Sequence, residues 1–239
     1  MTLAASRITV GFEPIYNKTL SPIPNPVDYE LTPAEAFTRG DMVTIVAGKI
    51  TKATAGTVTD VVGVMAESVA AADNPSGKIT LGKVYDHPDN VYRVTFVDQF
   101  DGIADAGSTT GKILDAAIAT SANDVWNGAL LYVYEGPAAG SVRTVSDYVG
   151  ATDELLVDTP FPVAPTTDSK FILLGAGAEA NDVINVGLGG IVLKDSKTVD
   201  ANAGRLSSAT KVGPLVCLDI RPADLMMDVM IRKSCHIFG

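Results

Sequence analysis

Short apolar runs alternate with turn residues along most of the chain. The runs are rich in branched or aromatic residues and are bounded by Gly, Pro, Asp or Asn; they lie at 130–135, 142–148, 155–157 and 171–174. This pattern is typical of consecutive strands joined by tight turns. The segment 136–140 reads Gly-Pro-Ala-Ala-Gly and separates the first two runs, so we predict a hairpin there.

A second set of short strands is predicted nearer the N-terminus, at 42–46, 49–53, 58–64 and 77–85. Turns fall at intervals of about ten residues, which is typical of a small barrel or sandwich. Residues 91–97 alternate regularly and add another strand. Only the segment 66–72 favours a helical turn, because Ala and Glu propagate helix well.

The remainder of the chain, residues 101–239, is predicted to form a second β-rich domain. We expect a polar, glycine-rich loop at 98–111, weak strands at 183–186 and 191–193, a loop at 194–209, and closing strands at 215–220 and 227–237. The fold class is therefore all-β, with helix in less than about one fifth of the residues. A barrel-like first domain covers 35–100, and the sequence leaves open whether the C-terminal strands return to it.

Residues 1–34 show little periodicity. Three alternate prolines, Pro22, Pro24 and Pro26, hold this segment extended. The simplest interpretation is a surface linker or frayed terminus. Its apolar side chains favour an extended N-terminal arm that lies on a partner, and the candidate contact residues are Phe12, Tyr16, Leu20, Ile23 and Val27.

Charge narrows the choice of partners. The chain has 18 basic and 28 acidic residues and a formal net charge of −10. Nucleic acid and anionic membranes repel such a chain unless it has a basic patch, and here the basic residues are scattered. No apolar run approaches the ~18 residues that suggest a membrane-spanning helix. We expect neither nucleic acid nor a membrane among the partners.

The two cysteines are predicted to be free thiols. In a C-terminal hairpin built around residues 221–224, Cys217 lies opposite a residue near Asp228 and not opposite Cys235. A disulfide would need a different pairing, so we expect a reducing compartment.

No histidine is placed for chemistry. His87 lies in an Asp-His-Pro-Asp turn and is expected to face solvent. His236 follows Cys235 in a predicted strand, where adjacent side chains point to opposite faces and cannot form a thiol–imidazole pair. We expect His236 in the interior or at a sheet edge. Two cysteines and two histidines so far apart make no zinc pattern.

Other motifs are incomplete. The glycines at 175–177 and 187–190 lack the remaining features of a dinucleotide or phosphate loop. Asp98, Asp101 and Asp105 do not have the spacing of an EF-hand. Residues 39–41 read Arg-Gly-Asp, but at a turn before a strand, so we do not expect cell adhesion. The sequence therefore predicts no enzyme, no cofactor and no metal.

Large apolar residues outside these motifs are assigned to packing. Trp126 is expected to anchor the core of its hairpin. Near the C-terminus, Met226, Met227 and Met230 are expected to fill a core or an interface, because methionine adapts to irregular surfaces.

Two segments resemble parts of phage structural proteins. Phe37-Thr38-Arg39-Gly40-Asp41-Met42-Val43, with 48–53 and 62–67, resembles the small β-barrel, or β-tulip-like domain, of tailed-bacteriophage capsid decoration (cement) proteins. In that barrel a Gly-Asp turn precedes a strand, a hairpin and a Gly-Val-Ala-like strand. The segment 128–172 resembles a β-module of phage structural proteins, although Pro137 and Ala138 replace part of its glycine turn. Together the two segments cover roughly half of the chain.

The resemblance implies a virion protein on the capsid exterior. Cement proteins are often homotrimers that bind the major capsid protein and tie neighbouring capsomers together. We expect Met226, Met227 and Met230 to contribute to the interface between subunits of the trimer. The N-terminal residues named above are expected to pack on a neighbouring subunit or on the capsid. The alternative is a virion fibre or tail component that binds a host receptor or glycan.

Overall fold

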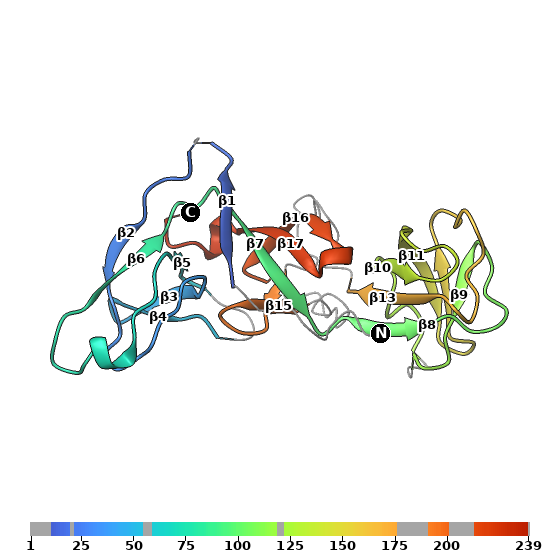
Figure 1. The fold of residues 1–239 in the computed structure, drawn as a ribbon, viewed down its shortest axis with the longest axis horizontal. Coiled ribbons are helices and arrows are strands. Elements are labelled where there is room, and N and C mark those ends of the chain that lie inside the picture. Colours follow the sequence, from blue (N-terminus) through green and yellow to red (C-terminus); the bar gives the residue numbers. More distant parts are fainter. Residues whose placement is uncertain are drawn as a thin grey trace.

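The structure is a computed structural model, and it describes residues 11–19, 22–54, 59–118, 122–175, 191–200 and 213–238. Its regular elements are almost all strands, which confirms the predicted all-β class. The helical elements described are short 3-10 turns: η1 (Ala71–Asp73), η5 (Pro222–Asp224) and η6 (Lys233–Cys235). Three curled sheets lie in a row and make the molecule elongated (Figure 1).

The first barrel is a sheet in the order β2-β6-β5-β3-β4. Its strands are β2 (Val27–Glu30), β3 (Met42–Val46), β4 (Lys49–Lys52), β5 (Val61–Met65) and β6 (Leu81–Tyr85). The sheet closes on itself, because Leu31 bridges to Ile50 and the Thr32 N–H donates to the Ile50 carbonyl at 2.8 Å. Alternating apolar side chains fill the interior; they include Leu31, Phe37, Val43, Ile50 and Met65.

The central barrel is a sheet in the order β14-β15-β7-β17-β16. Its strands are β7 (Asn90–Val97), β14 (Val192–Leu193), β15 (Thr198–Asp200), β16 (Leu215–Arg221) and β17 (Met226–Ile231). Ile191 and Leu215 exchange backbone hydrogen bonds of 3.0 and 3.3 Å, which join the two ends of the sheet. β15 runs parallel to β7, and the other pairs are antiparallel.

The third barrel is a sheet in the order β8-β13-β10-β11-β12-β9. Its strands are β8 (Phe100–Ile103), β9 (Lys112–Leu114), β10 (Leu130–Glu135), β11 (Val142–Val149), β12 (Glu154–Val157) and β13 (Lys170–Leu174). The Asp105 N–H donates to the Leu114 carbonyl at 2.7 Å and links the end of β8 to β9. The predicted hairpin is confirmed as β10 and β11, and Trp126 is buried in this core as predicted.

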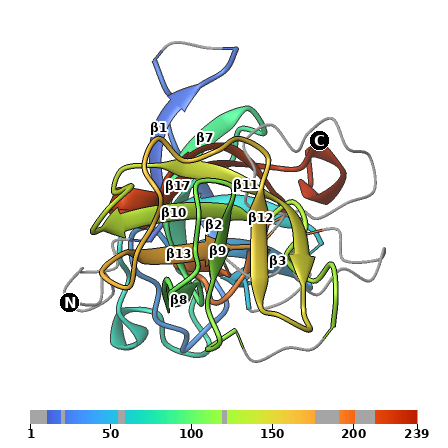
Figure 2. The ribbon, with the colours of Figure 1, turned by 90° about the vertical axis from the view of Figure 1, so that its right-hand side faces the viewer.

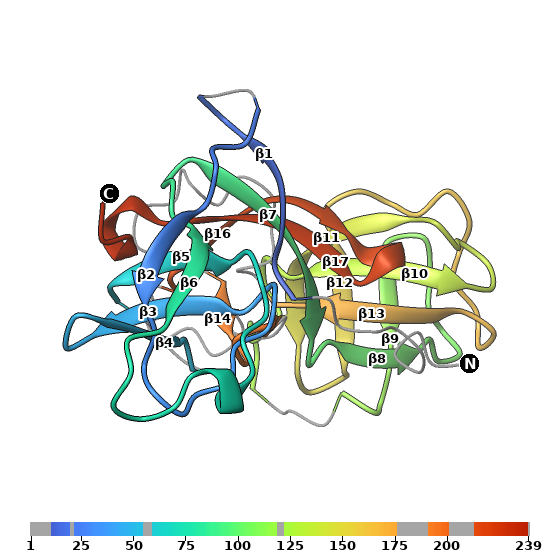
Figure 3. The same cartoon turned by 60° about the vertical axis from the view of Figure 1, so that its left-hand side comes forward.

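The core of the central barrel extends into both of its neighbours, which also have cores of their own. The central cluster holds Met42 and Val64 from the first barrel together with Ile172 and Leu174 from the third. Leu130 and Leu174, which pair across β10 and β13, face this cluster from the third barrel. β7 also leads into β8 with only two residues between them, so the chain passes from the central to the third barrel without a linker (Figures 1 and 3). The row of barrels is therefore packed as one body.

The N-terminal arm predicted over 1–34 is not separate in its described part. β1 (Glu13–Asn17) pairs with β7, and β2 completes the first barrel. Periodicity could not reveal β1, because Pro14 interrupts it and the register shifts between Pro14 and Tyr16. Proline is tolerated there because β1 lies at a sheet edge.

The C-terminal strands return to β7, one of the two arrangements that the sequence left open. β17 lies between β7 and β16, with Asp228 opposite Arg93. Cys217 pairs with Val229, next to the predicted Asp228, and neither cysteine forms a disulfide, as predicted. β17 ends at Ile231, so the strand predicted as far as residue 237 was too long.

Two strands occur where loops were predicted. β8 lies within the polar stretch 98–111, and β15 lies within 194–209. β8 contains Gly102 because a Cβ there would clash with the ring of Phe171 on the neighbouring strand. The weak strand predicted at 183–186 lies outside the described residues.

Candidate interaction surface

The outer side of the central barrel carries the residues that could meet a partner. Along β7, Tyr92, Val94 and Phe96 belong to the core, so the alternate residues Val91 and Arg93 face the other side of the sheet. β17 alternates in the same way: Met227, Val229 and Ile231 point inward and Met226, Asp228 and Met230 outward. We call this outward side of β1, β7, β17 and β16 the outer face.

An apolar row crosses the outer face from strand to strand. Val216 pairs with Met230, Met230 with Val91, and Val91 with Tyr16. Cross-strand neighbours on one face lie within side-chain contact of each other. Val91 and Val216 are buried, at 0% and 5% exposed, Met230 is half-buried, and Tyr16, at the end of the row, is 45% exposed. The row therefore crosses four strands, β16, β17, β7 and β1, and ends on an accessible aromatic ring.

A polar row runs beside the apolar one. Asp219 pairs with Asp228, Asp228 with Arg93, and Arg93 with Glu13. Arg93 donates to the two Asp228 oxygens at 2.8 and 3.0 Å. This hydrogen bond, together with the nearby carboxylates, raises the pKa of the Arg93 guanidinium. Arg221 lies 3.9 Å from Asp228 and 3.7 Å from Asp219, so charges of both signs alternate along the row.

The predicted contact residues divide between the core and the surface. Phe12 and Met227 are 1% and 0% exposed in the central core, so their assignment to a partner interface was wrong. Both side chains pack in the core of the central barrel, and this tertiary contact cannot be recognised from the local sequence. The other described candidates are partly or well exposed: Tyr16, Ile23, Val27, Met226 and Met230. Leu20 lies outside the described residues.

The chain between β1 and β2 projects beyond the outline of the barrels (Figures 2 and 3). Its proline-rich part, residues 22–26, precedes Val27, which is 46% exposed. At its other side, Asn17 is buried and anchors the end of β1 to the turn between β6 and β7. Tyr16 therefore sits where the outer face meets this projection.

Both histidines lie at the junction of the first and central barrels. His236 is buried and bridges to Val61 of β5. Its interior position was predicted, although it follows η6 and does not lie in a strand. Burial lowers the pKa of its imidazole, with a smaller opposing effect from Asp86. His87 is only half-buried and hydrogen-bonded, so the prediction of a solvent-facing turn was incomplete.

The Arg-Gly-Asp turn holds two barrels together. Asp41 is buried and accepts hydrogen bonds from the Thr38 N–H (2.7 Å), the Thr38 hydroxyl (2.9 Å) and the Ser196 hydroxyl (2.9 Å). Ser196 belongs to the central barrel, and its carbonyl also accepts from the Met42 N–H at 2.7 Å. The carboxylate is therefore occupied inside the protein.

A small hollow lies beside the same turn. It has a volume of about 180 Å³ and is lined by Phe12, Glu13, Arg39 and Gly40. Among the described residues, one carboxylate (Glu13) and one guanidinium (Arg39) line it. Within the described ranges, no group of three or more His, Cys, Asp or Glu residues is placed to hold a metal ion.

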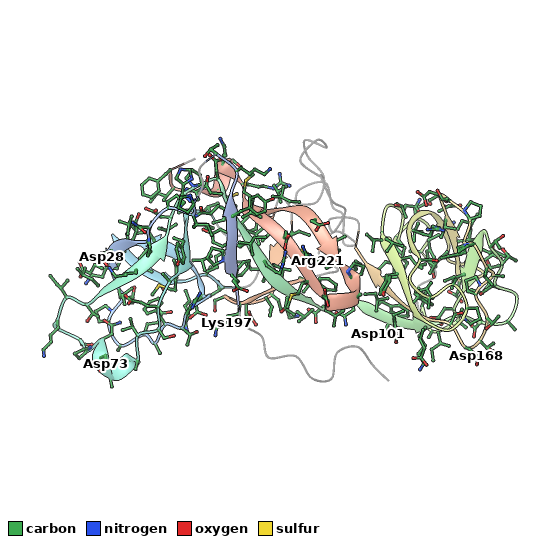
Figure 4. The ribbon with its side chains drawn as sticks, turned by 45° about the horizontal axis from the view of Figure 1, so that its top comes forward. Asp28, Asp73, Asp101, Asp168, Lys197 and Arg221 are labelled. Atoms are coloured by element: carbon green, nitrogen blue, oxygen red, sulfur yellow. The ribbon has the colours of Figure 1, made fainter. Side chains whose placement is uncertain are left out.

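Charged side chains are spread along the whole length. Figure 4 shows Asp28 and Asp73 on the first barrel, Arg221 on the central barrel, and Asp101 and Asp168 on the third. Several surface carboxylates are paired, as in Lys83–Asp28 at 2.9 Å and Lys170–Glu135 at 2.8 Å. None of the helices in the part of the chain described is long and apolar enough to cross a membrane.

No family model matches this chain, and neither do any of the curated proteins or solved structures with which it was compared. The strongest candidate for a functional surface is the outer face, where Tyr16, Met226 and Met230 lie around the Arg93–Asp228 ion pair.

Proposed function

We propose that this chain is a structural virion protein that binds the exterior of a phage capsid and bridges neighbouring capsomers. The observation that carries the proposal is the outer face, where Tyr16 and Met230 reach the surface on the middle one of three barrels, and the core of this barrel extends into both neighbours. A bridging protein has to transmit load between two contacts. Three barrels that pack against one another through the central core suit that task.

The outer face has the composition of a contact surface. Tyr16, Met226 and Met230 supply apolar area, and tyrosine and methionine are enriched at interfaces. Burial of such area contributes roughly 25 cal/mol per Å² before the cost of association is subtracted. On a symmetric shell many copies act together, so a modest affinity at each position is sufficient.

The resemblance to cement proteins points in the same direction. The first barrel contains the Phe37–Val43 segment that carries the resemblance, and Asp41 fixes the turn before β3. The resemblance also implies the major capsid protein as partner and self-association into a trimer. A fibre or tail component would instead recognise a host glycan or receptor.

The test is co-sedimentation of the purified protein with bare capsids of the phage that encodes it. We expect saturable binding that is weakened at least about tenfold by Tyr16→Glu, because a carboxylate cannot be buried without a partner. The matched control is Val46→Glu, a 58% exposed position at the β3–β4 turn of the first barrel. Absence of binding, with selective binding to a glycan array, would replace the capsid proposal by the fibre one.

A further inference from the structure

Asn17 ties the end of β1 to the turn between β6 and β7. Its side-chain amide lies 2.8 Å from Asn90 Oδ1 and 3.0 Å from His87 Nδ1. Beside it, the Lys18 N–H donates to the Asp89 carbonyl at 3.0 Å, and the Thr19 hydroxyl donates to Asp89 Oδ2 at 3.0 Å. These contacts hold the residue after Tyr16 and the start of the projecting chain.

The contacts determine which way each group points. Asn17 Oδ1 accepts from the Thr19 N–H at 3.0 Å and lies 3.1 Å from the Thr19 hydroxyl, whose single proton it shares with Asp89. The NH₂ group of Asn17 must therefore be the one that faces His87. The Asp89 N–H also donates to the same ring nitrogen, at 3.2 Å. His87 Nδ1 thus accepts two hydrogen bonds, so the ring is neutral and carries its proton on Nε2.

Protonation of His87 would place an N–H at Nδ1, where two donors already point. Both hydrogen bonds would be lost, and the donors would face a cation. We propose that His87 is a proton-sensitive latch that holds the end of β1, and with it Tyr16 of the outer face, in place only while its ring is neutral. This regulation rests on the proposed function in so far as it concerns capsid binding.

The charged groups around the latch are occupied by other partners. The Asp86 carboxylate accepts from the Tyr29 hydroxyl at 2.7 Å. Asp89 accepts from Thr19 and has Lys233 at 3.9 Å. A further titratable neighbour is the buried imidazole of His236. Its pKa is lowered mainly by burial, raised by the charge of Asp86 and lowered by the nearby His87. Both carboxylates are therefore engaged elsewhere. Neither is placed to accept the hydrogen bonds that Asn17 and the Asp89 N–H now donate to the His87 ring.

The latch can be tested on the protein alone by amide hydrogen exchange. Between pH 7.5 and 5.0 we expect the Lys18 and Thr19 amides to lose about tenfold in protection after correction for intrinsic rates. NMR of the two imidazoles identifies the transition, since the chain has only His87 and His236.

Three variants separate the latch from general acid effects. His87→Asn keeps an acceptor at the δ position that cannot be protonated there, so protection should persist at both pH values. His87→Ala should lose protection at both. His236→Asn, the matched control, should leave the pH response unchanged. A response that survives in His87→Asn, or protection that does not change while His87 titrates, would overturn the latch.

Capsid binding is measured in parallel, so that the proposal about His87 and the proposed capsid function can be tested independently of each other. If the latch regulates docking, the wild-type protein binds bare capsids more weakly at pH 5.0 than at pH 7.5, and His87→Asn removes the difference. An intact exchange response without capsid binding at either pH supports the latch and overturns the proposed function. Capsid binding without an exchange response overturns the latch alone.

Discussion

Arg93 of β7 and Asp228 of β17 face each other directly across the sheet, joined by two hydrogen bonds of 2.8 and 3.0 Å. The carboxylate is 7% exposed and the guanidinium 27%. They join strands whose sequences are more than a hundred residues apart, so the pair fixes the register of the C-terminal strand on the central barrel. The same pair lies at the centre of the outer face.

Removing one partner of this pair should cost more than removing both. Arg93→Met leaves Asp228 buried with only the more distant Arg221, and we expect the free energy of unfolding to fall by about 2–4 kcal/mol. The double variant Arg93→Met/Asp228→Leu should lose less than the sum of the two single variants. Chemical denaturation of all four proteins measures this, and purely additive losses would contradict a coupled pair.

Asp41 should be a stability residue and not a recognition residue. Asp41→Ala removes the acceptor of three hydrogen bonds between and within barrels, so we expect a loss of about 2–4 kcal/mol. Asp41→Asn, which keeps one oxygen, should lose less. The control is Asp73→Ala at an exposed position in η1, expected within about 0.5 kcal/mol of wild type. Equal stability of Asp41→Ala and wild type would refute the assignment.

Stability should fall in mild acid partly because of His236. Burial lowers the pKa of this imidazole, so the unfolded chain binds a proton more readily than the folded one below the ordinary value of about 6.5. The stabilisation is complete above that pH and is lost as pH falls toward the folded pKa. Each unit of lowering corresponds to about 1.4 kcal/mol. The midpoint of chemical unfolding should fall less between pH 7.5 and pH 5.5 for His236→Gln than for the wild type. An equal fall in the two proteins would show that His236 does not contribute.

The protein should form a trimer through the part of the outer face that β16 and β17 form, which carries Met226 and Met230. Light scattering should then give three times the 24.9 kDa mass of one chain. Met230→Glu should shift the species toward monomer, because it places a carboxylate in the apolar row, whereas Val46→Glu should not. A wild-type monomer at high concentration, together with isolated monomers on the capsid, would contradict the prediction.

Local patterns predicted the hairpins and barrels better than the connections between them. The strands at 42–46 and 130–135 are mainly apolar and are bounded by turn residues, so their local pattern was sufficient. β8 escaped detection because its glycine is needed where Phe171 approaches, a contact that only the folded sheet creates. Short strands of this kind owe their formation to their neighbours.

The candidate surface could be predicted only in part. Tyr16 and Met230 were identified from their apolar character, and the structure places them in one row. Phe12 and Met227 have the same character but fill the core, and no local signal separates the two groups. The Asn17–His87 contact joins residues 70 positions apart, so sequence spacing could not reveal it.

The most direct test of the central claim is a cryo-electron microscopy reconstruction of bare capsids incubated with the protein. We expect elongated density on the capsid exterior, with each copy contacting two neighbouring capsomers through the end of the outer face that carries Tyr16. The Tyr16→Glu protein should leave the same positions poorly occupied. Particles whose exterior stays bare at saturating protein, or density confined to the tail, would contradict the account.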